Sequence, residues 1–297
     1  MTSIKEKILE KTNEAQEIVY SYLPKAEGYQ KTVLSAMNYS VRAGGKRLRP
    51  ILMNETYQMF GGKDRSIIDP FMAAIEMIHT YSLIHDDLPA LDNDDTRRGK
   101  PTCHVQYTEA MAILAGDGLL NFAYETASKA FRGDEQDIKT AKAMRVLASK
   151  PGIYGMIGGQ TVDVESEAQP ADFDTLMYID ENKTGALIEC AMMIGAILAG
   201  ANDEDVKRIE KIASNVGIAF QIQDDILDVT STTEELGKPV GSDEKNQKVT
   251  YVSMKGLEQA ERDVENYTNE AVREFDALDV TDPFLRELLI YLASRKK

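Results

Sequence analysis

The spacing of apolar residues is the feature that most constrains how this 297-residue chain can fold. Apolar side chains recur at three- and four-residue intervals in most windows, a period that matches one face of an α-helix. No alternating run typical of a half-buried strand stands out. Helical patterns cover about 4–22, 28–43, 47–60, 69–86, 107–131, 137–148, 152–166, 172–200, 202–228 and 257–292. We therefore expect an all-α fold, with one domain over residues 1–297.

Charge and cysteine content exclude several classes of protein. The chain has 34 Lys and Arg against 49 Asp and Glu, a net charge of −15, which has the wrong sign for binding a nucleic-acid backbone. Two cysteines, Cys103 and Cys190, are too few for a disulfide framework. The amino terminus lacks an apolar signal core, so we expect a cytoplasmic protein. The longest apolar run, 186–201, contains Glu189 and predicts a buried core helix, not a membrane span.

Two of the predicted helices end in acidic clusters. The first begins with Asp69 as its N-cap and Pro70 at its first position, and it ends at Asp86. The second opens after Asn202 and ends at Asp228. A polar stretch over about 230–250 then follows, and a loop of that length is often a functional lid.

The acidic clusters lie where stability alone would not place them. Acids at the carboxyl end of a helix oppose its dipole at a cost of roughly 0.3–1 kcal/mol each. Asp224 and Asp228 are four residues apart on a helix and share a face, whereas Asp86 and Asp92 need a bulge around Pro89 to converge. Solvated helix ends are the simpler interpretation of one cluster. Two clusters favour magnesium bound together with a diphosphate substrate.

Basic residues indicate a second anion site. Gly44-Gly45-Lys46-Arg47-Leu48-Arg49-Pro50 is a turn with three cations in four positions, and the diarginine at 97–98 adds two guanidinium groups that can bind phosphate oxygens in pairs. An exposed basic patch is the alternative interpretation. It is less favoured once two acidic clusters accompany the basic residues.

These motifs together resemble the trans-isoprenyl diphosphate synthase family, specifically its short-chain bacterial members close to farnesyl diphosphate synthase. The family order is present as GGKRLRP at 44–50, DDxxxxD at 86–92 followed by RRGKPT, GGQ at 158–160, KTG at 183–185, FQIQDDILD at 220–228, GK at 237–238 and KxTY at 248–251. The resemblance implies a single-domain, all-α isoprenoid synthase bundle around a deep central cavity. It also implies magnesium-dependent 1'-4 condensation of isopentenyl diphosphate with dimethylallyl and geranyl diphosphate.

The resemblance also implies a role for individual residues. About three magnesium ions would bind Asp86, Asp92 and Asp224, with Asp87, Asp225 and Asp228 as supporting acids. The allylic diphosphate would be neutralised by Arg97, Lys183 and Lys238. Isopentenyl diphosphate would bind Lys46, Arg49, His79 and Arg98. The developing allylic cation would face Thr184 and Gln221, with Gln160 and Asp163 bordering the same cavity.

Product length is expected to depend on Tyr81. This residue precedes Asp86 by five positions, which is about 7.5 Å along a helix. In the family that the chain resembles, a bulky aromatic at or beside this position forms the cavity floor. Its neighbour Ser82 is small, so the floor would depend largely on Tyr81. This pattern implies a C15 product, farnesyl diphosphate, with geranylgeranyl diphosphate as the alternative.

Two rival functions come from other classes. A class I terpene cyclase also has an aspartate-rich motif, but its second metal motif differs from FQIQDDILD and it needs no second diphosphate site. A non-catalytic subunit of a heteromeric synthase would usually lack one aspartate motif, and both are intact here. The family resemblance further implies a homodimer, with the apolar helix around 107–131 as a candidate interface.

Overall fold

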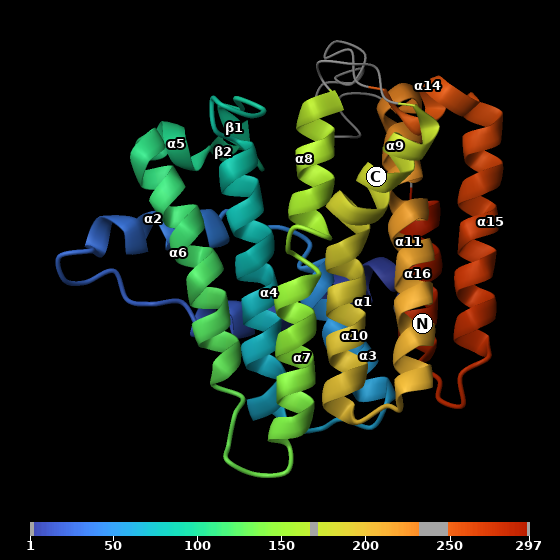
Figure 1. Ribbon diagram of the computed structural model, residues 1–297, viewed down its shortest axis with the longest axis horizontal. Helices are drawn as coiled ribbons and strands as arrows, with labels where there is room; N and C mark the ends of the chain where they lie inside the picture. Colours follow the sequence, from blue (N-terminus) through green and yellow to red (C-terminus); the bar gives the residue numbers. More distant parts are fainter. Residues whose placement is uncertain (1–2, 167–171, 232–248, 296–297) are drawn as a thin grey trace. The chain divides into compact units, whose positions relative to one another are not determined.

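The protein is built almost entirely of helices, which confirms the predicted all-α fold. The computed structural model describes residues 3–166, 172–231 and 249–295. In this part of the chain, one short hairpin is the extended structure (Figure 1): β1 (Thr96–Arg97) and β2 (Lys100–Pro101). The helices are α1 (Ile4–Ser21), α2 (Lys31–Val41), α3 (Leu48–Met59), α4 (Arg65–Asp86), α5 (Cys103–Gln106), α6 (Glu109–Ser128), α7 (Asp137–Ser149), α8 (Met156–Ser166), α9 (Phe173–Ile179), the π-helix η1 (Asp180–Gly185), α10 (Ala186–Ala199), α11 (Asp203–Thr230), α14 (Tyr251–Lys255), α15 (Leu257–Asp276) and α16 (Pro283–Ser294).

Contacts divide the chain into two compact units. The amino-terminal unit comprises Met1–Arg145 with Ile197–Gly200, and the carboxy-terminal unit comprises Val146–Ala196 with Ala201–Lys297. The expectation of one domain over residues 1–297 stays a prediction.

Helix α4 forms the core of the amino-terminal unit. It packs along α6 (Figure 1) and also contacts α1, α2 and α3. Its residues Ile68, Phe71, Ile75 and Ile78 are fully buried. Neighbours therefore cover α4 on several faces, which explains why its sequence is apolar nearly all round.

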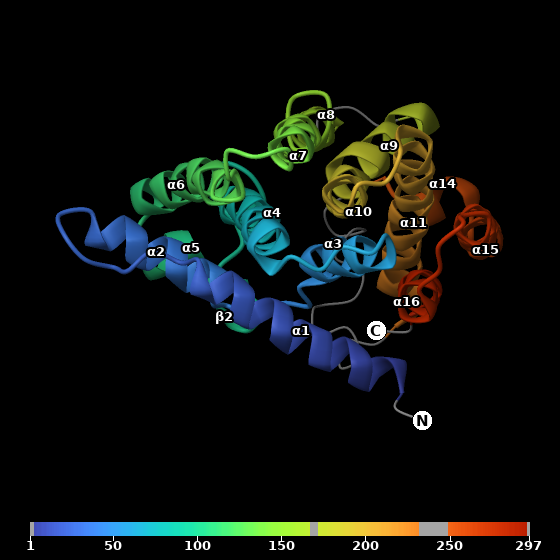
Figure 2. The same ribbon diagram turned by 90° about the horizontal axis from the view of Figure 1, so that it is seen from below.

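Helix α11 is the corresponding element of the carboxy-terminal unit. It packs along α15 and also contacts α16, α14 and η1 (Figure 2). Ile218, Ile222 and Ile226 line one side of α11 and join a buried cluster with Tyr251 and Val264. These isoleucines recur every fourth residue, so this side of α11 faces the core.

The helix starts agree with the sequence in one case and differ in the other. Asn202 caps α11 as predicted, because its side chain accepts hydrogen bonds from the N–H groups of Glu204 and Asp205. The prediction of Asp69 as the N-cap of α4 was wrong. The helix begins at Arg65, capped by Asp64, whose carboxylate accepts hydrogen bonds from both the backbone N–H and the hydroxyl of Ser66.

Other predicted boundaries also changed. The stretch predicted as one helix over 257–292 is two helices, because α15 ends at Asp276 and α16 begins at Pro283 with Asp282 as its N-cap. The stretch 172–200 is continuous but contains the π-helical turn η1. Single-turn π segments are frequent at functional sites, and this one carries the KTG sequence.

The apolar run at 186–201 is a core helix, as predicted. Its one acid, Glu189, is buried and bound by the ammonium group of Lys150, which also bonds Glu210 at 2.7 Å. By length and composition alone, Arg65–Asp86 and Phe173–Ala199 could cross a bilayer. However, 78% and 72% of these windows are buried inside the protein, as expected of core helices.

Both cysteines are free and buried, one in each unit. Cys103 lies in the amino-terminal unit and Cys190 in the carboxy-terminal unit, with 3% and 0% of their surfaces exposed. Burial raises the pKa of the Cys103 thiol. This environment disfavours the reactive thiolate.

A buried ion pair fixes the glycine-rich turn to the core. Arg47, the N-cap of α3, has a left-handed backbone with φ of 48°. Its guanidinium group donates to Glu76 Oε1 and to the Val41 carbonyl, both at 2.6 Å. The two side chains of the ion pair are 0% and 2% exposed. Arg47 therefore does not join Lys46 and Arg49 as a cation for an anionic ligand.

We predict that Arg47→Met lowers the free energy of unfolding by roughly 3–5 kcal/mol, because it leaves the Glu76 carboxylate buried and unpaired. Adding Glu76→Leu should recover most of that loss. Urea unfolding followed by circular dichroism would measure both. Arg132→Met, which breaks the half-exposed pair with Asp64, is the control and should cost about 1 kcal/mol or less. A similar small cost for Arg47→Met would contradict the prediction.

Candidate active site

The first aspartate-rich motif lies where α4 ends. Asp86 is the last helical residue, and the chain then turns back so that the Asp92 N–H donates to the Asp86 carbonyl at 2.8 Å. Asn93, with φ of 53°, completes the turn by donating its N–H to the Leu88 carbonyl at 3.1 Å. The backbones of Asp86 and Asp92 therefore converge, as the predicted departure from helix around Pro89 requires.

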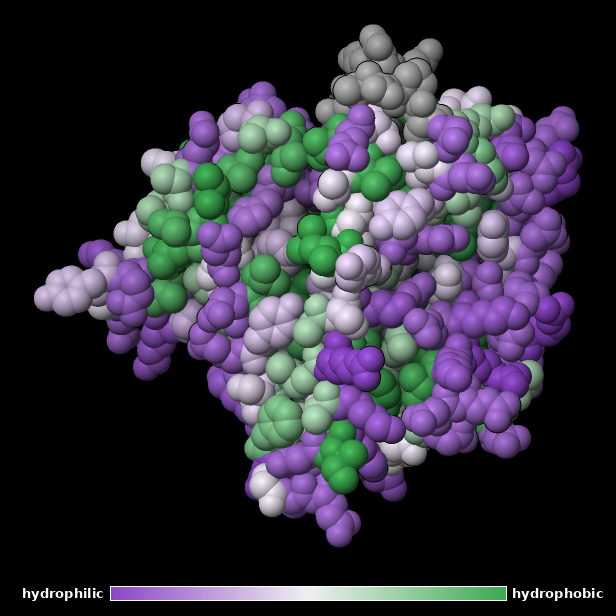
Figure 3. All heavy atoms as spheres, viewed as in Figure 1, coloured by the Kyte–Doolittle hydropathy of each residue, from purple (hydrophilic) through white to green (hydrophobic). Residues whose placement is uncertain are grey.

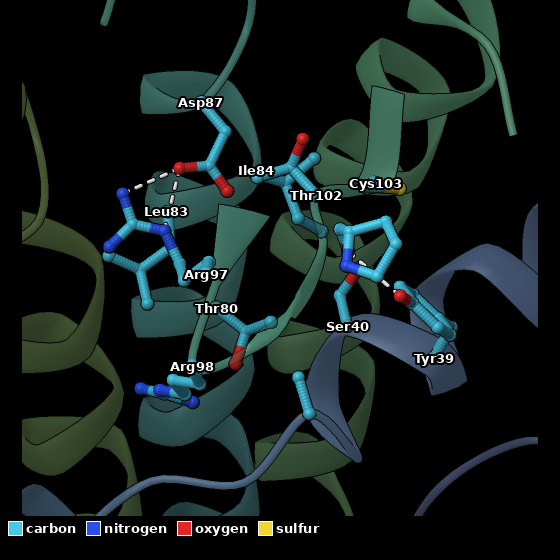
Figure 4. Close-up of a pocket in the computed structure, with 12 residues that line it drawn as sticks. Tyr39, Ser40, Thr80, Leu83, Ile84, Asp87, Arg97, Arg98, Thr102 and Cys103 are labelled. Atoms are coloured by element: carbon cyan, nitrogen blue, oxygen red, sulfur yellow. Dashed lines mark hydrogen bonds and ion pairs between the residues drawn. The ribbon is translucent and has the colours of Figure 1, made fainter. Parts of the chain in front are cut away.

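The second aspartate of this motif is paired with arginine. Asp87 Oδ1 accepts a hydrogen bond from Arg97 Nε at 2.6 Å, and the Asp87 side chain is only 5% exposed (Figure 4). Burial raises the pKa of Asp87, and the neighbouring Arg97 opposes this shift. Arg97 also lies 3.4 Å from Asp94. The metal role of Asp87 and the diphosphate role of Arg97 stay predictions, since here the two residues hold each other.

The diarginine is presented by a tight hairpin that the sequence analysis missed. Arg97 pairs with Lys100, and the two residues between them, Arg98 and Gly99, have φ of 53° and 73°. Positive φ at both central positions is typical of a type I' turn. The hairpin borders a small pocket lined by Asp87, Arg97 and Arg98, among others (Figure 4). The glycine in the RRGK sequence was the signal from which this hairpin turn could have been predicted.

The hairpin brings Arg98 to the glycine-rich turn. Arg98 Nη1 donates to the Gly44 carbonyl. A Cβ atom at Gly45 would lie 2.8 Å from the Arg98 guanidinium group, and Gly45 has φ of 132°. Only glycine suits that backbone and that separation. The two basic motifs predicted to bind a second anion are therefore neighbours.

His79 belongs to the same basic cluster. The pKa of His79 is held well below its usual range, mainly by burial of the ring and further by the charges of Arg49, Arg98, Arg47 and Arg97. Arg49 and Arg98 are thus near enough to His79 to act on its charge, and the assignment of the three residues to isopentenyl diphosphate stays a prediction. A neutral imidazole surrounded by guanidinium groups is suited to donating one N–H to a phosphate oxygen.

The lowered pKa of His79 predicts a loss of stability in mild acid. Below its ordinary pKa of 6.5 the unfolded chain binds a proton that folded His79 does not bind, so the free energy of unfolding falls as pH drops. His79→Gln should lose less stability than the parent protein between pH 7.5 and 5.5. Urea titrations at the two pH values would measure this difference. Equal losses in both proteins would contradict the prediction.

In the carboxy-terminal unit, η1 places the KTG residues against α8 and α11. Lys183 Nζ bonds Asp163 Oδ2 at 2.6 Å, and Thr184 Oγ1 donates to Gln221 Oε1 at 3.0 Å. The structure therefore brings these four predicted residues into two contacting pairs. Gln160 lies on α8 as well.

Two glycines permit these contacts. A Cβ atom at Gly159 of the GGQ motif would lie 2.3 Å from the Lys183 backbone nitrogen. A Cβ atom at Gly217 would lie 2.8 Å from the Gly185 Cα atom. Both distances are shorter than non-bonded atoms tolerate, so η1 can approach α8 and α11 this closely only beside glycine.

The second aspartate-rich motif holds its three acids in different surroundings. Asp224 has a side chain that is 45% exposed and bonds Arg295 at 2.5 Å. Asp225 is buried and accepts hydrogen bonds from the Tyr251 N–H at 2.8 Å and Gln221 Nε2 at 3.2 Å. Asp228 is 2% exposed. Asp225 therefore ties the TY residues of the KxTY motif to the second aspartate motif.

The sequence analysis missed two contacts of this motif, and one predicted residue is not among the described residues. Nothing local marks Arg295 or the Tyr251 N–H as partners of acids 71 and 26 positions away. Lys238 lies outside the described residues, as does most of the proposed lid over 230–250. Within the described residues, no three His, Cys, Asp or Glu side chains form a group that could hold a metal ion by themselves.

The Gly217 contact yields a prediction. Gly217→Ala should push η1 away from α11 and separate Thr184 from Gln221, and a displacement near 1 Å can cost about 10²-fold in rate. Gly185→Ala is the matched control, because its Cβ atom would meet the Asp180 carbonyl oxygen at an ordinary 3.5 Å. Steady-state turnover of both variants, with circular dichroism to verify folding, would test this. Equal turnover in the two variants would count against the proposed packing role.

Comparison with known proteins identifies the family. The family model for polyprenyl synthetase matches residues 30–282. The chain belongs to this family. It is 41% identical over 294 residues to the farnesyl diphosphate synthase of Geobacillus stearothermophilus, covering 98% of this chain and 97% of that protein.

Two further comparisons concern product and ligands. The chain is 44% identical to the geranylgeranyl diphosphate synthase of Cyanophora paradoxa, over 88% of this chain and 87% of that protein. The structure resembles a Helicobacter pylori geranyltransferase complexed with magnesium and isoprenyl diphosphate, with a TM-score of 0.83, 32% identity, and coverage of 98% and 97% of the two chains.

Proposed function

We propose that this polyprenyl synthetase is a short-chain trans-isoprenyl diphosphate synthase that makes farnesyl diphosphate. It would condense isopentenyl diphosphate with dimethylallyl and then geranyl diphosphate. The observation that carries the proposal is the approach of the two basic motifs beside the first aspartate motif: Arg98 bonds the Gly44 carbonyl, and Arg97 bonds Asp87. A cationic site of this kind suits a diphosphate, and a terpene cyclase needs no such second site. Near full-length similarity to a farnesyl diphosphate synthase supports the same choice.

Magnesium fits the donor chemistry of the two motifs. Magnesium is usually held by one or two carboxylates, with water and substrate phosphate oxygens completing its octahedron. Magnesium binding therefore does not require three side-chain ligands from the protein. Asp86, Asp92 and Asp224 are the residues that would hold it, with about three ions per active site as the family implies. When bound, the metal neutralises charge on the diphosphate leaving group.

The chain's own residues would support ionisation in two ways. Arg97, Lys183 and Lys238 supply cations for the departing diphosphate, and Thr184 and Gln221 present oxygen atoms to the allylic cation. Arg97 and Lys183 would exchange their present partners, Asp87 and Asp163, for phosphate oxygens. A strong protein base is not needed, because the released diphosphate can accept the proton lost after condensation.

Tyr81 would limit chain growth. Its side chain is 6% exposed, and its hydroxyl makes no hydrogen bond within the described residues. Burial, with the nearby Tyr124 and Asp86, raises the pKa of Tyr81 to about 12. The ring packs edge-on against His85 at 5.8 Å. Such a neutral, rigid aromatic side chain below Asp86 can act as a floor.

We predict that Tyr81→Ala shifts the product from C15 toward C20 and longer chains, since it opens space below the diphosphate site. Ser82→Ala is the matched control. It should keep the C15 product, because Ser82 is small and the change removes only a hydroxyl that bonds the His79 carbonyl. Chromatography of the dephosphorylated alcohols would measure chain length. An unchanged distribution in Tyr81→Ala would contradict the floor role.

The direct test of the function uses the purified protein with labelled isopentenyl diphosphate and dimethylallyl or geranyl diphosphate, with magnesium or EDTA. Magnesium-dependent farnesol after dephosphorylation is the expected result. A C20 alcohol would favour the geranylgeranyl alternative, which the Cyanophora relative supports. Hydrocarbon from farnesyl diphosphate would indicate a cyclase. Activity only after mixing with a partner chain would indicate a non-catalytic subunit.

A cytoplasmic homodimer completes the proposal. Apolar side chains gather over α6 and the preceding α5 (Figure 3). Val105, Ile113 and Leu114 are 49%, 45% and 49% exposed, although they are large and apolar. This surface supports α6 as the dimer interface.

A further inference from the structure

Arg295, at the end of α16, holds the first aspartate of the second motif. Its Nη2 atom lies 2.5 Å from Asp224 Oδ1 and 3.2 Å from the Phe220 carbonyl oxygen. Its Nη1 atom donates to the Leu292 carbonyl. The guanidinium carbon lies 3.6 Å from the centre of the Phe220 ring. One buried side chain thus joins the last helix to the residues that precede and begin the second aspartate motif.

Arg295 is the fixed member of this ion pair. It is 4% exposed, and two carbonyl oxygens and an aromatic face hold it independently of Asp224. A further bond, from Gln223 Nε2 to the Arg295 carbonyl at 3.2 Å, fixes its backbone. The Asp224 side chain, by contrast, is 45% exposed. An exposed carboxylate held by a buried guanidinium group is oriented by it.

A group that orients a metal-binding carboxylate affects metal affinity without touching the metal. Arg295 contacts one carboxylate oxygen of Asp224. Within the described residues, this ion pair is the polar contact of the Asp224 side chain. Holding Oδ1 removes rotational freedom from the carboxylate. The entropy cost of fixing the side chain is then met before a cation binds. Loss of such outer partners typically lowers metal affinity or activity 10- to 100-fold.

We propose that Arg295 is a positioning residue for magnesium-dependent binding of the allylic diphosphate, acting through Asp224. The proposal rests on the proposed function, which assigns Asp224 to magnesium. It extends the active site to the carboxy-terminal helix, a region that none of the sequence motifs includes. Simple electrostatics predicts the opposite effect, because a cation beside Asp224 repels a second one. The experiment distinguishes the two by the sign of the change in magnesium requirement.

The test uses the full chain and a non-reactive allylic ligand, dimethylallyl S-thiolodiphosphate, titrated by calorimetry at increasing magnesium concentrations. Arg295→Met should raise the magnesium concentration for half-maximal ligand binding 10- to 100-fold. Binding of isopentenyl diphosphate without metal should stay within twofold of the parent protein. Arg286→Met is the matched control: Arg286 lies on α16, its exposed ion pair is with Asp276 at the end of α15, and its loss should leave the magnesium dependence unchanged.

Two more variants separate positioning from a general loss of structure. Arg295→Lys keeps the charge but loses the planar fork, and it should give an intermediate magnesium requirement. Asp224→Asn should raise the requirement by itself, and adding Arg295→Met to it should raise it no further. An additive effect, which indicates action outside Asp224, would overturn the proposal.

The remaining outcomes distinguish failure of this inference from failure of the proposed function on which it rests. If the parent protein binds the allylic analogue with a magnesium requirement and Arg295→Met needs the same or less magnesium, the positioning role is refuted while the synthase function stands. If folded parent protein shows no magnesium-dependent binding of the analogue, the proposed function fails and the role of Arg295 fails with it.

Discussion

Repulsion between clustered carboxylates is the constraint on which the candidate site depends. In both aspartate motifs the acids lie at or near the carboxyl end of a long helix, where the dipole adds to their mutual repulsion. The structure relieves this cost in the same way twice. The second aspartate of each motif is buried against a donor, Arg97 for Asp87 and the Tyr251 N–H for Asp225. The first aspartate of the second motif keeps an exposed carboxylate.

Close backbone approach is the second requirement, and glycine meets it in both units. Gly45 lets a guanidinium group lie directly on the turn, whereas Gly159 and Gly217 let η1 lie against two helices. The missing Cβ atom makes room for the Arg98 guanidinium group at Gly45, for the Lys183 backbone nitrogen at Gly159 and for the Gly185 Cα atom at Gly217. The glycines of the GGKR and GGQ motifs therefore position functional residues without contributing any chemistry of their own.

The sequence predicts the fold class and most helices because apolar periodicity records which faces are buried. It also names residues that the structure brings into contact, since Thr184 bonds Gln221 and Lys183 bonds Asp163. It could not predict the start of α4, because Asp64 and Asp69 are both acceptable caps and the Ser66 contact decides between them. Arg47 and Arg49 look equivalent in the sequence. Only the tertiary structure shows that Arg47 is buried in the core, where it forms an ion pair with Glu76.

The two buried thiols give the protein a built-in probe of local opening. Cys103 and Cys190 belong to different units, and neither is reachable in the folded state. A thiol reagent can therefore label each cysteine only when the unit around it opens. Site-resolved labelling rates would report the opening free energy of each unit separately. Matching values would mean that the chain unfolds as one cooperative body, and different values would show which set of helices opens first.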